Sequence, residues 1–257
     1  MAVSFKLREG RGELSGLRQS GSLKLLFPRR SSAAAQAVLV NTAGGVTGGD
    51  RFSLRAEVGP GAAATLTTQA AERAYRARDA EPGRIDTRLR AEAGAELNWL
   101  PQETILFNGC RIARSLRIDL ATDARLLLAE SLVFGRAAMG ETIDRAWFSD
   151  RIEIVRSGKP AYIDRLDFAG DISAQLARPH VAGGAGAIAS LVLIRPDAPA
   201  HLAWIRAALP ATGGASLVGE DMLLIRLLAA DSFLLRQTLV PMLNRLTCHS
   251  LPRPWMI

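Results

Sequence analysis

Short runs of alternating apolar and polar residues are the feature that most narrows what this chain can fold into. Apolar side chains fall on every second position in residues 52–58, 84–90, 116–120 and 151–155. A period of two residues is that of a β-strand with one buried and one solvated face. Turn-forming pairs such as Gly-Pro, Pro-Gly and Ala-Gly separate the runs. The pattern predicts a mainly β fold, either a sandwich or a wound antiparallel sheet.

Helical periodicity begins only in the C-terminal part of the chain. Residues 198–209 carry an apolar stripe, and Asp197 is in position to cap the first turn. A second helix is predicted after Asp231 or Ser232, and Pro241 is expected to kink or split it. The apolar stripe of this second helix comprises Leu235, Leu239, Met242, Leu243 and Leu246.

Composition narrows the class of protein further. The 257 residues are 48% apolar and 22% charged, which is typical of a folded globular protein. Neither a transmembrane span nor a secretory signal is expected, and two cysteines outside any Cys-x-x-Cys motif fit a reducing cytoplasm. Because no internal repeat or linker is visible, we predict one cytoplasmic domain over residues 1–257.

The positive charge does not by itself indicate nucleic-acid binding. The formal net charge is +7, but the basic residues are interleaved with acids, as in Arg78-Asp79 and Asp150-Arg151. Such interleaving is typical of a solvated strand face, and no RNA-binding motif of aromatic and basic residues is visible. We therefore do not expect a nucleic-acid partner.

The densest local signal is the glycine-rich segment Asn41-Thr-Ala-Gly-Gly-Val-Thr-Gly-Gly-Asp50. Gly44 and Gly49 have the spacing of a phosphate-binding loop, but Asp50 and Arg51 stand where that loop has Lys and then Ser or Thr. A carboxylate at that point would repel phosphate. We expect instead a backbone that needs positive φ or close approach at several glycines, with Asp50 at the end of a tight turn.

No constellation of catalytic or metal-binding residues is evident. The histidines His180, His201 and His249 lack metal-site spacing, and no serine lies in a nucleophile elbow. His249 follows Cys248, and these two soft ligands are too few to close a metal site. A transient contact of this pair with nickel or zinc stays open, and we expect no tightly bound cofactor.

Five segments, in order along the chain, together resemble the signature of the UreD (also called UreH) family of urease accessory proteins. They are residues 41–51, 67–76, 100–107, 134–141 and 251–255. Family members often have Pro-Gly where this chain has Gln69-Ala70, so the turn there is expected to differ. The residues that carry the resemblance are Asn41, Thr42, Gly44, Gly45, Gly48, Gly49, Thr67, Thr68, Gln69, Tyr75, Arg76, Pro101, Gln102, Phe107, Arg136, Gly140 and Trp255.

The resemblance implies a chaperone and not an enzyme. UreD-type proteins bind apo-urease and the accessory proteins UreF and UreG, and nickel reaches the urease centre through this assembly. Hydrolysis of GTP belongs to UreG. The family fold is predominantly β, with superhelically wound strands and a few helices. For this chain the resemblance implies wound, antiparallel-rich sheets, these three protein partners, and nickel that is held only transiently.

Three carboxylates in the family segments are candidates for a nickel path, namely Asp50, Glu103 and Glu141. Weak, exchangeable contacts release a metal more readily than a closed site of soft ligands does. The alternative is that these carboxylates satisfy backbone amides or pair with arginines such as Arg136. Two rival functions also stay open: a β-rich scaffold without a metal role, and an enzyme that uses Asp50 and Glu103 as paired carboxylates.

A protein that holds several partners is expected to expose contiguous apolar surface and to be poorly soluble alone. The candidate surface is the apolar stripe of the second helix together with the chain end Trp255-Met-Ile257. The alternative is that this helix packs its stripe against its own sheet.

Overall fold

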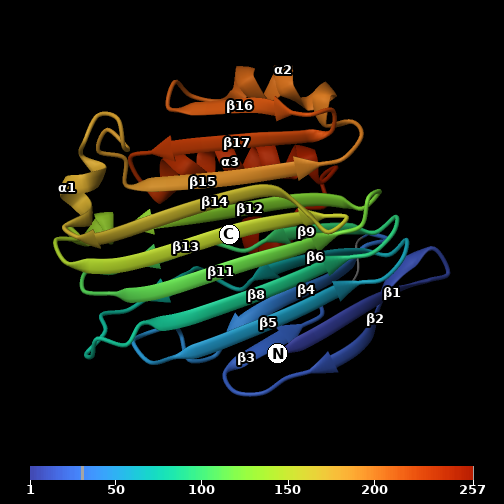
Figure 1. Ribbon diagram of the computed structural model, residues 1–257, viewed down its shortest axis with the longest axis horizontal. Helices are drawn as coiled ribbons and strands as arrows, with labels where there is room; N and C mark the ends of the chain where they lie inside the picture. The colour runs from blue at the N-terminus through green and yellow to red at the C-terminus, as the bar shows by residue number, and fades with distance from the viewer. Residues whose placement is uncertain (30–31, 257) are drawn as a thin grey trace.

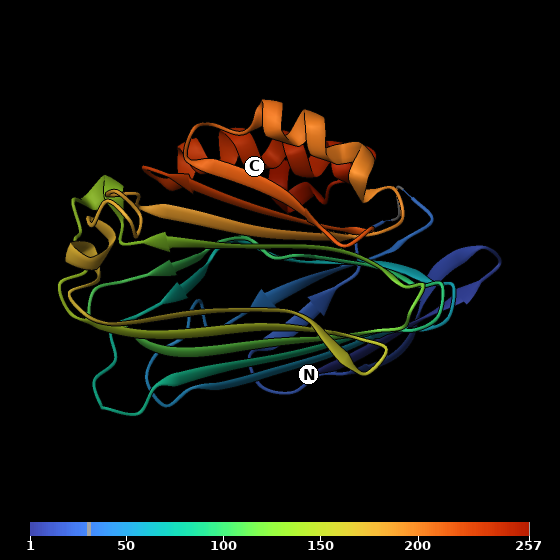
Figure 2. The same cartoon turned by 45° about the horizontal axis from the view of Figure 1, so that its top comes forward.

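Two β-sheets stacked face to face form the body of the protein (Figures 1 and 2). The computed structural model describes residues 1–29 and 32–256. Over these residues the front sheet of Figure 1 has seven strands, in the order β14 (Lys159–Gly170), β13 (Ala146–Arg156), β11 (Arg111–Leu120), β8 (Gly83–Ala91), β5 (Arg51–Val58), β1 (Ala2–Arg8) and β2 (Arg11–Arg18).

The back sheet is larger, with ten strands in the described residues. Eight follow the order β16 (Gly213–Val218), β17 (Met222–Ala229), β15 (Ala187–Ile194), β12 (Arg125–Phe134), β9 (Glu96–Leu100), β6 (Ala63–Thr68), β4 (Ala35–Asn41) and β3 (Leu23–Leu26). The short strand β10 (Thr104–Leu106) pairs with the end of β12 and with β7 (Glu72–Ala74).

The chain winds from one sheet to the other. Strands β4, β6, β9 and β12 lie in the back sheet, and β5, β8, β11 and β13 follow them in turn in the front sheet. Each strand therefore returns to its sheet after a full turn and runs parallel to the preceding strand of that sheet. The mainly β, wound fold that the sequence and the family resemblance predict is confirmed.

The strand pairing corrects the expectation of antiparallel-rich sheets. Parallel pairs fill the wound middle of both sheets, and antiparallel pairs join only the outer strands: β2 to β1, β14 to β13, β3 to β4, and β12 through β15 and β17 to β16. Alternation of side chains has the same period in either pairing, so it carries no information on strand direction. Direction is set by the connections, which cross between sheets.

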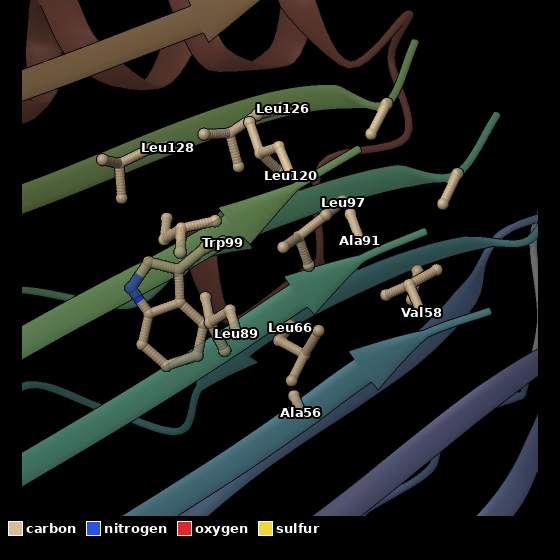
Figure 3. Packing of buried hydrophobic residues seen from close by; sticks show 14 of the residues in the cluster. Ala56, Val58, Leu66, Leu89, Ala91, Leu97, Trp99, Leu120, Leu126 and Leu128 are labelled. Atoms are coloured by element: carbon tan, nitrogen blue, oxygen red, sulfur yellow. The ribbon is translucent and has the colours of Figure 1, made fainter. Parts of the chain in front are cut away.

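Inward-facing side chains of the two sheets pack into a shared apolar layer, part of which Figure 3 shows. Leu66, Leu97 and Leu126 come from the back sheet, and Leu89 and Leu120 come from the front sheet. Each of these five residues is at most 4% exposed. Burial of one leucine side chain contributes about 1.5–3 kcal/mol. The four runs predicted as strands lie in β5, β8, β11 and β13, and their apolar positions supply the front half of this layer.

The two longest helices, α2 (Ala198–Ala208) and α3 (Ser232–Leu246), cover the outer face of the back sheet (Figure 2). Asp231 caps α3 by accepting a hydrogen bond from the Leu234 backbone N–H at 2.8 Å. Asp197 precedes α2 as predicted but makes no capping bond, because its carboxylate pairs with Arg195 at 2.9 Å instead. The remaining helical segments are α1 (Ile172–Leu176) and the 3₁₀ turns η1 (Ala137–Met139) and η2 (Arg253–Met256).

Helix α3 continues through Pro241 and is not split. A proline inside a helix costs about 3 kcal/mol. Leu239, Met242 and Leu243 on either side of it are at most 3% exposed, and packing of this stripe against the back sheet outweighs that cost. None of the helices in residues 1–29 and 32–256 combines the length and apolar character that a membrane crossing needs.

The apolar stripe of α3 is therefore not the exposed partner surface that was considered for it. Every residue of the stripe is buried, and Trp255 is only 1% exposed. Met256 is 56% exposed, whereas Ile257 lies outside the described residues. Helix α3 exposes Phe233 and Leu234 at its start, outside the stripe. Five of the twelve large exposed apolar side chains of the described residues lie in strands β1 to β3 and just after them. They are Leu7, Leu14, Leu17, Leu26 and Phe27.

The backbone conformation of Ala70 leads to a testable prediction about stability. It follows β6 with φ of +59° and is exposed, so it adopts the left-handed conformation that favours glycine. Replacing Ala70 with glycine is expected to raise the free energy of unfolding by about 0.5–1 kcal/mol, because relief of strain exceeds the entropic cost of glycine. The measurement is urea unfolding followed by tryptophan fluorescence. Ala93→Gly, at an exposed position without positive φ, is the control and is expected to lower stability.

Candidate functional site

The glycine-rich segment forms the turn between β4 and β5 as expected. Gly44 and Gly49 have φ of +78° and +83°, which glycine adopts without strain. The other two glycines allow close approach: a Cβ on Gly45 would lie 2.3 Å from Cε2 of Tyr75, and one on Gly48 would lie 2.8 Å from the Glu81 carbonyl oxygen. All four glycines thus serve the path of the backbone.

The carboxylate of Asp50 closes this turn. Its Oδ2 accepts a hydrogen bond from the Thr47 backbone N–H at 2.9 Å, so it satisfies a backbone amide. At the other end of the turn the Asn41 side chain donates to the Gly45 carbonyl at 2.8 Å and to the Glu72 carboxylate at 3.1 Å. Burial raises the pKa of Glu72 above its usual value, and the hydrogen bond from Asn41 only partly opposes that effect.

Four of the five family segments meet beside this turn. The hydroxyl of Tyr75 donates to the Gly44 carbonyl at 3.2 Å, and the Tyr75 ring lies edge-on to Phe107 with centroids 5.1 Å apart. The guanidinium of Arg136 stacks 4.4 Å from the centroid of Phe107. Arg136 also pairs with Glu141 at 2.8 Å, and this partner lowers the Glu141 pKa. Winding of the chain thus joins segments that are far apart in the sequence.

The fifth family segment, residues 251–255, meets the third, residues 100–107, at helix α3. Arg236 of α3 donates to Gln102 at 2.8 Å, to Glu103 at 2.9 Å and to the Trp255 carbonyl at 3.0 Å. The indole of Trp255 in turn donates to the Leu100 carbonyl at 3.0 Å. Glu103 is 5% exposed, so its charge is compensated inside the protein by Arg236.

Other residues of the family segments also hold turns and connections. Thr42 donates to the Ser22 carbonyl at 2.8 Å, and the Thr68 hydroxyl accepts from the Gln102 backbone N–H at 2.8 Å. The Arg76 carbonyl accepts from the Thr47 hydroxyl at 2.9 Å, and Gly140 has φ of +62°. Thr67 and Pro101 are buried, whereas Gln69 is exposed.

A cluster between the two sheets has three charged residues, all outside the family segments, that were missed from the sequence. Arg114 of β11 pairs with Asp150 of β13 at 2.5 Å and with Glu130 of β12 at 3.2 Å. Arg114 also donates to the Thr104 hydroxyl of β10 at 2.8 Å, and the indole of Trp99 donates to Glu130 at 2.7 Å. The cluster therefore joins the front sheet to the back sheet by charge-assisted bonds.

Burial controls the electrostatics of this cluster. It raises the pKa of Glu130, and the nearby negative charge of Asp150 adds to that effect, although Arg114 opposes it. Burial alone would lower the pKa of Arg114, but Asp150 and Glu130 outweigh it and hold that pKa above its usual value. The adjoining cavity of about 10 Å³ has room for roughly one water molecule.

A signal in the sequence could have revealed these residues. Arg114, Glu130 and Asp150 occupy inward positions of their strands, two residues from buried apolar neighbours on either side. In β11 the inward positions are Leu120, Ile118 and Leu116, and the next inward position toward the start of the strand is Arg114. A charged residue in an otherwise apolar inward series predicts a buried partner of opposite charge.

The candidate nickel-path residues do not form one site. No hydrogen bond or ion pair among the described residues joins Asp50, Glu103 and Glu141, and each has a different partner. Within residues 1–29 and 32–256 no three histidine, cysteine, aspartate or glutamate residues are grouped so as to hold a metal. Cys248 and His249 are exposed, with φ of +49° and +60°, and Asn244 contacts the His249 ring at 3.1 Å.

Comparison with known proteins decides the family. The model of the UreD urease accessory protein family matches residues 1–256. The chain belongs to the UreD family. The urease accessory protein UreD of Ruegeria pomeroyi is 51% identical over 257 residues, which cover 100% of both chains. Its counterpart in Roseobacter denitrificans is 48% identical over 255 residues, 99% of this chain and 93% of that one. That of Brucella suis is 41% identical over 259 residues, 99% and 92% of the two chains.

Membership of the UreD family assigns the chain to urease maturation. The family segments meet in two places, the turn next to Tyr75 and the contacts of Arg236. In both places their side chains hold other parts of the chain together. The charged cluster at Arg114 contacts both Trp99, which belongs to the apolar layer of Figure 3, and Thr104 of the third family segment.

The charged cluster generates a prediction about stability. Arg114→Met removes the cation from between Glu130 and Asp150 and is expected to lower the free energy of unfolding at pH 7 by about 3–5 kcal/mol. Burial already raises the pKa of Glu130, and loss of Arg114 raises it further. A folded-state pKa above the unfolded value means that protonation favours folding, so the deficit is expected to shrink as pH falls from about 7 to about 5.

The measurement is urea unfolding of both proteins at several pH values. Arg117→Met is the matched control, since Arg117 lies on the same strand but is 43% exposed, and its loss is expected to cost less than about 1 kcal/mol. An Arg114→Met deficit that is small, or that grows as pH falls, contradicts the assignment of a buried, mutually compensating cluster.

Proposed function

We propose that this chain is a non-enzymatic chaperone of the cytoplasm that scaffolds apo-urease together with UreF and UreG and conducts nickel to the urease active site. The observation that carries the proposal is the match of the UreD family over residues 1–256. The contacts of the family segments agree with it, because those segments shape the backbone and present no nucleophile with an activating base. Nickel is cargo in this proposal and is held transiently.

Three carboxylates in the connections between strands are the proposed route for a divalent cation. Oxygen ligands contact nickel weakly enough to exchange it. Glu103 is buried and pairs with Arg236. Asp50 and Glu141 lie nearer the surface, where Asp50 accepts a hydrogen bond from a backbone amide and Glu141 pairs with Arg136. Passage of a cation along these residues requires that each carboxylate exchange its present partner for the metal. Arrival of partner proteins would supply such a rearrangement.

The rival functions have less support. An enzyme with paired carboxylates needs Asp50 and Glu103 on one substrate, but Asp50 is bonded to Thr47 in its own turn and Glu103 to Arg236 of α3. A scaffold without a metal role shares all the structural contacts and differs only in nickel transfer. Nickel content of urease therefore separates the two scaffolds.

The nickel route has a direct test. Asp50→Ala and Glu103→Gln are expected to leave the complex with UreF, UreG and urease intact but to lower the nickel content and activity of urease in nickel-limited cells. Glu103→Gln removes the charge and keeps an acceptor for Arg236. Nickel is measured by mass spectrometry of purified urease, and assembly is measured by co-purification.

Glu220→Ala removes an exposed acid from the β16–β17 turn and is the control for nickel delivery. Full nickel content with both route variants shows that delivery does not depend on Asp50 or Glu103. Loss of assembly along with nickel assigns these carboxylates to folding or partner binding.

The chain alone is expected to bind no nucleotide. Its glycine-rich turn lacks the lysine of a phosphate-binding loop, and the Asp50 carboxylate occupies the Thr47 amide that phosphate would need. Titration calorimetry with GTP and with ATP, each with Mg²⁺, is expected to give no heat of binding up to millimolar nucleotide. Micromolar affinity for either nucleotide contradicts the proposed division of roles with UreG.

A further inference from the structure

Three arginines lie in one row across the outer face of the front sheet. Arg55 of β5 is directly opposite Arg88 of β8, and Ala2 of β1 separates Arg55 from Arg18 of β2. All three arginines are exposed. Strands in a sheet are about 4.8 Å apart, so the row from Arg18 to Arg88 spans three intervals, or roughly 14 Å.

Arg18, Arg55 and Arg88 have no ion-pair partner within residues 1–29 and 32–256. Arg117 of β11, which continues the row directly opposite Arg88, pairs with Asp119 at 2.9 Å, and neighbouring Arg90 pairs with Glu92 at 2.8 Å. Like charges directly opposite each other on a sheet are destabilising. The repulsion between Arg55 and Arg88 therefore destabilises the fold slightly, and an anion bound between the two guanidinium groups would relieve it.

The row borders a hollow of about 540 Å³. Its floor is formed by the small residues Ala2, Ser4 and Gly16 of β1 and β2. A Cβ on Gly16 would lie 2.9 Å from the Ser4 hydroxyl oxygen, so glycine keeps the floor low. The strands that line the hollow, β1, β2, β5 and β8, lie in the lower part of Figure 1.

We propose that this hollow binds an extended, acidic segment of a partner protein. Side chains on one face of an extended segment recur about every 6.8 Å. Three carboxylates at alternate positions therefore span roughly 14 Å, which equals the length of the row from Arg18 to Arg88. Arginine pairs with carboxylates through two parallel hydrogen bonds, so such a contact has a defined geometry in addition to charge attraction.

A peptide fits the hollow better than a nucleic acid does. Glu57 and Asp119 line the same hollow, next to Arg55 and Arg90. A continuous phosphate backbone would meet these two carboxylates and be repelled, whereas a peptide can place neutral residues against them. Identification of the partner as a member of the urease maturation assembly rests on the proposed function, but the acid preference of the hollow does not.

The test uses the purified full-length chain and a labelled seven-residue peptide with glutamate at positions 2, 4 and 6 and serine elsewhere. Fluorescence anisotropy at low salt is expected to show binding that weakens about tenfold or more when glutamine replaces glutamate, or when the protein carries Arg55→Ala with Arg88→Ala. Arg84→Ala, on the same strand and face as Arg88 but outside the hollow, is expected to leave the affinity unchanged within about twofold.

Thermal unfolding shows whether the double variant is folded, and its melting temperature is expected to equal or exceed that of the parent, because like-charge repulsion has been removed. Absence of glutamate-dependent binding, or equal binding by the double variant, overturns the proposal. Tighter binding of a single-stranded oligonucleotide of equal charge also overturns it in favour of nucleic acid. These measurements test the hollow and need no urease. Co-purification with UreF, UreG and urease tests the scaffold role, so the two proposals can fail independently.

Discussion

Closure of the two wound sheets on each other is the constraint on which the rest of the structure depends. The apolar layer between them is the largest of the three apolar clusters of the described residues, with residues such as Leu66 and Leu89 almost fully enclosed. Arg114 is the polar part of the same interface, since its partners Asp150 and Glu130 lie in different sheets. A buried charge held this way favours one relative position of the sheets, because any other leaves it unpaired.

The winding also explains where the family segments meet. Each pass through the two sheets brings the chain back beside its previous turn, so connections from successive turns stack at the same end. Tyr75, Phe107 and Arg136 come from three such connections and touch one another in series. Arg236 connects the wound body to α3 and to the C-terminal Trp255. Segments that bear the family signature thus secure the geometry that partner proteins would recognise.

Sequence patterns predicted local structure well. Period-two alternation located four strands of the wound body, and the glycine-rich segment was correctly expected to need positive φ and close approach. Strand direction and the pairing of Glu103 with Arg236 were not predictable, because both depend on residues brought together over long distances, 133 positions in the second case. Arg114, Glu130 and Asp150 were each visible as a charged residue in an apolar inward series, yet their pairing with one another was not.

The sequence by itself determined the mainly β character, the turns, the two late helices and, through its five ordered segments, the UreD family. These properties depend on neighbouring residues or on the order of motifs along the chain. Only the tertiary structure decided which carboxylate meets which cation, that the α3 stripe is buried, and that Arg18, Arg55 and Arg88 form one row. Such contacts follow from strand register and winding, which alternation leaves undefined because its period is the same for every partner strand.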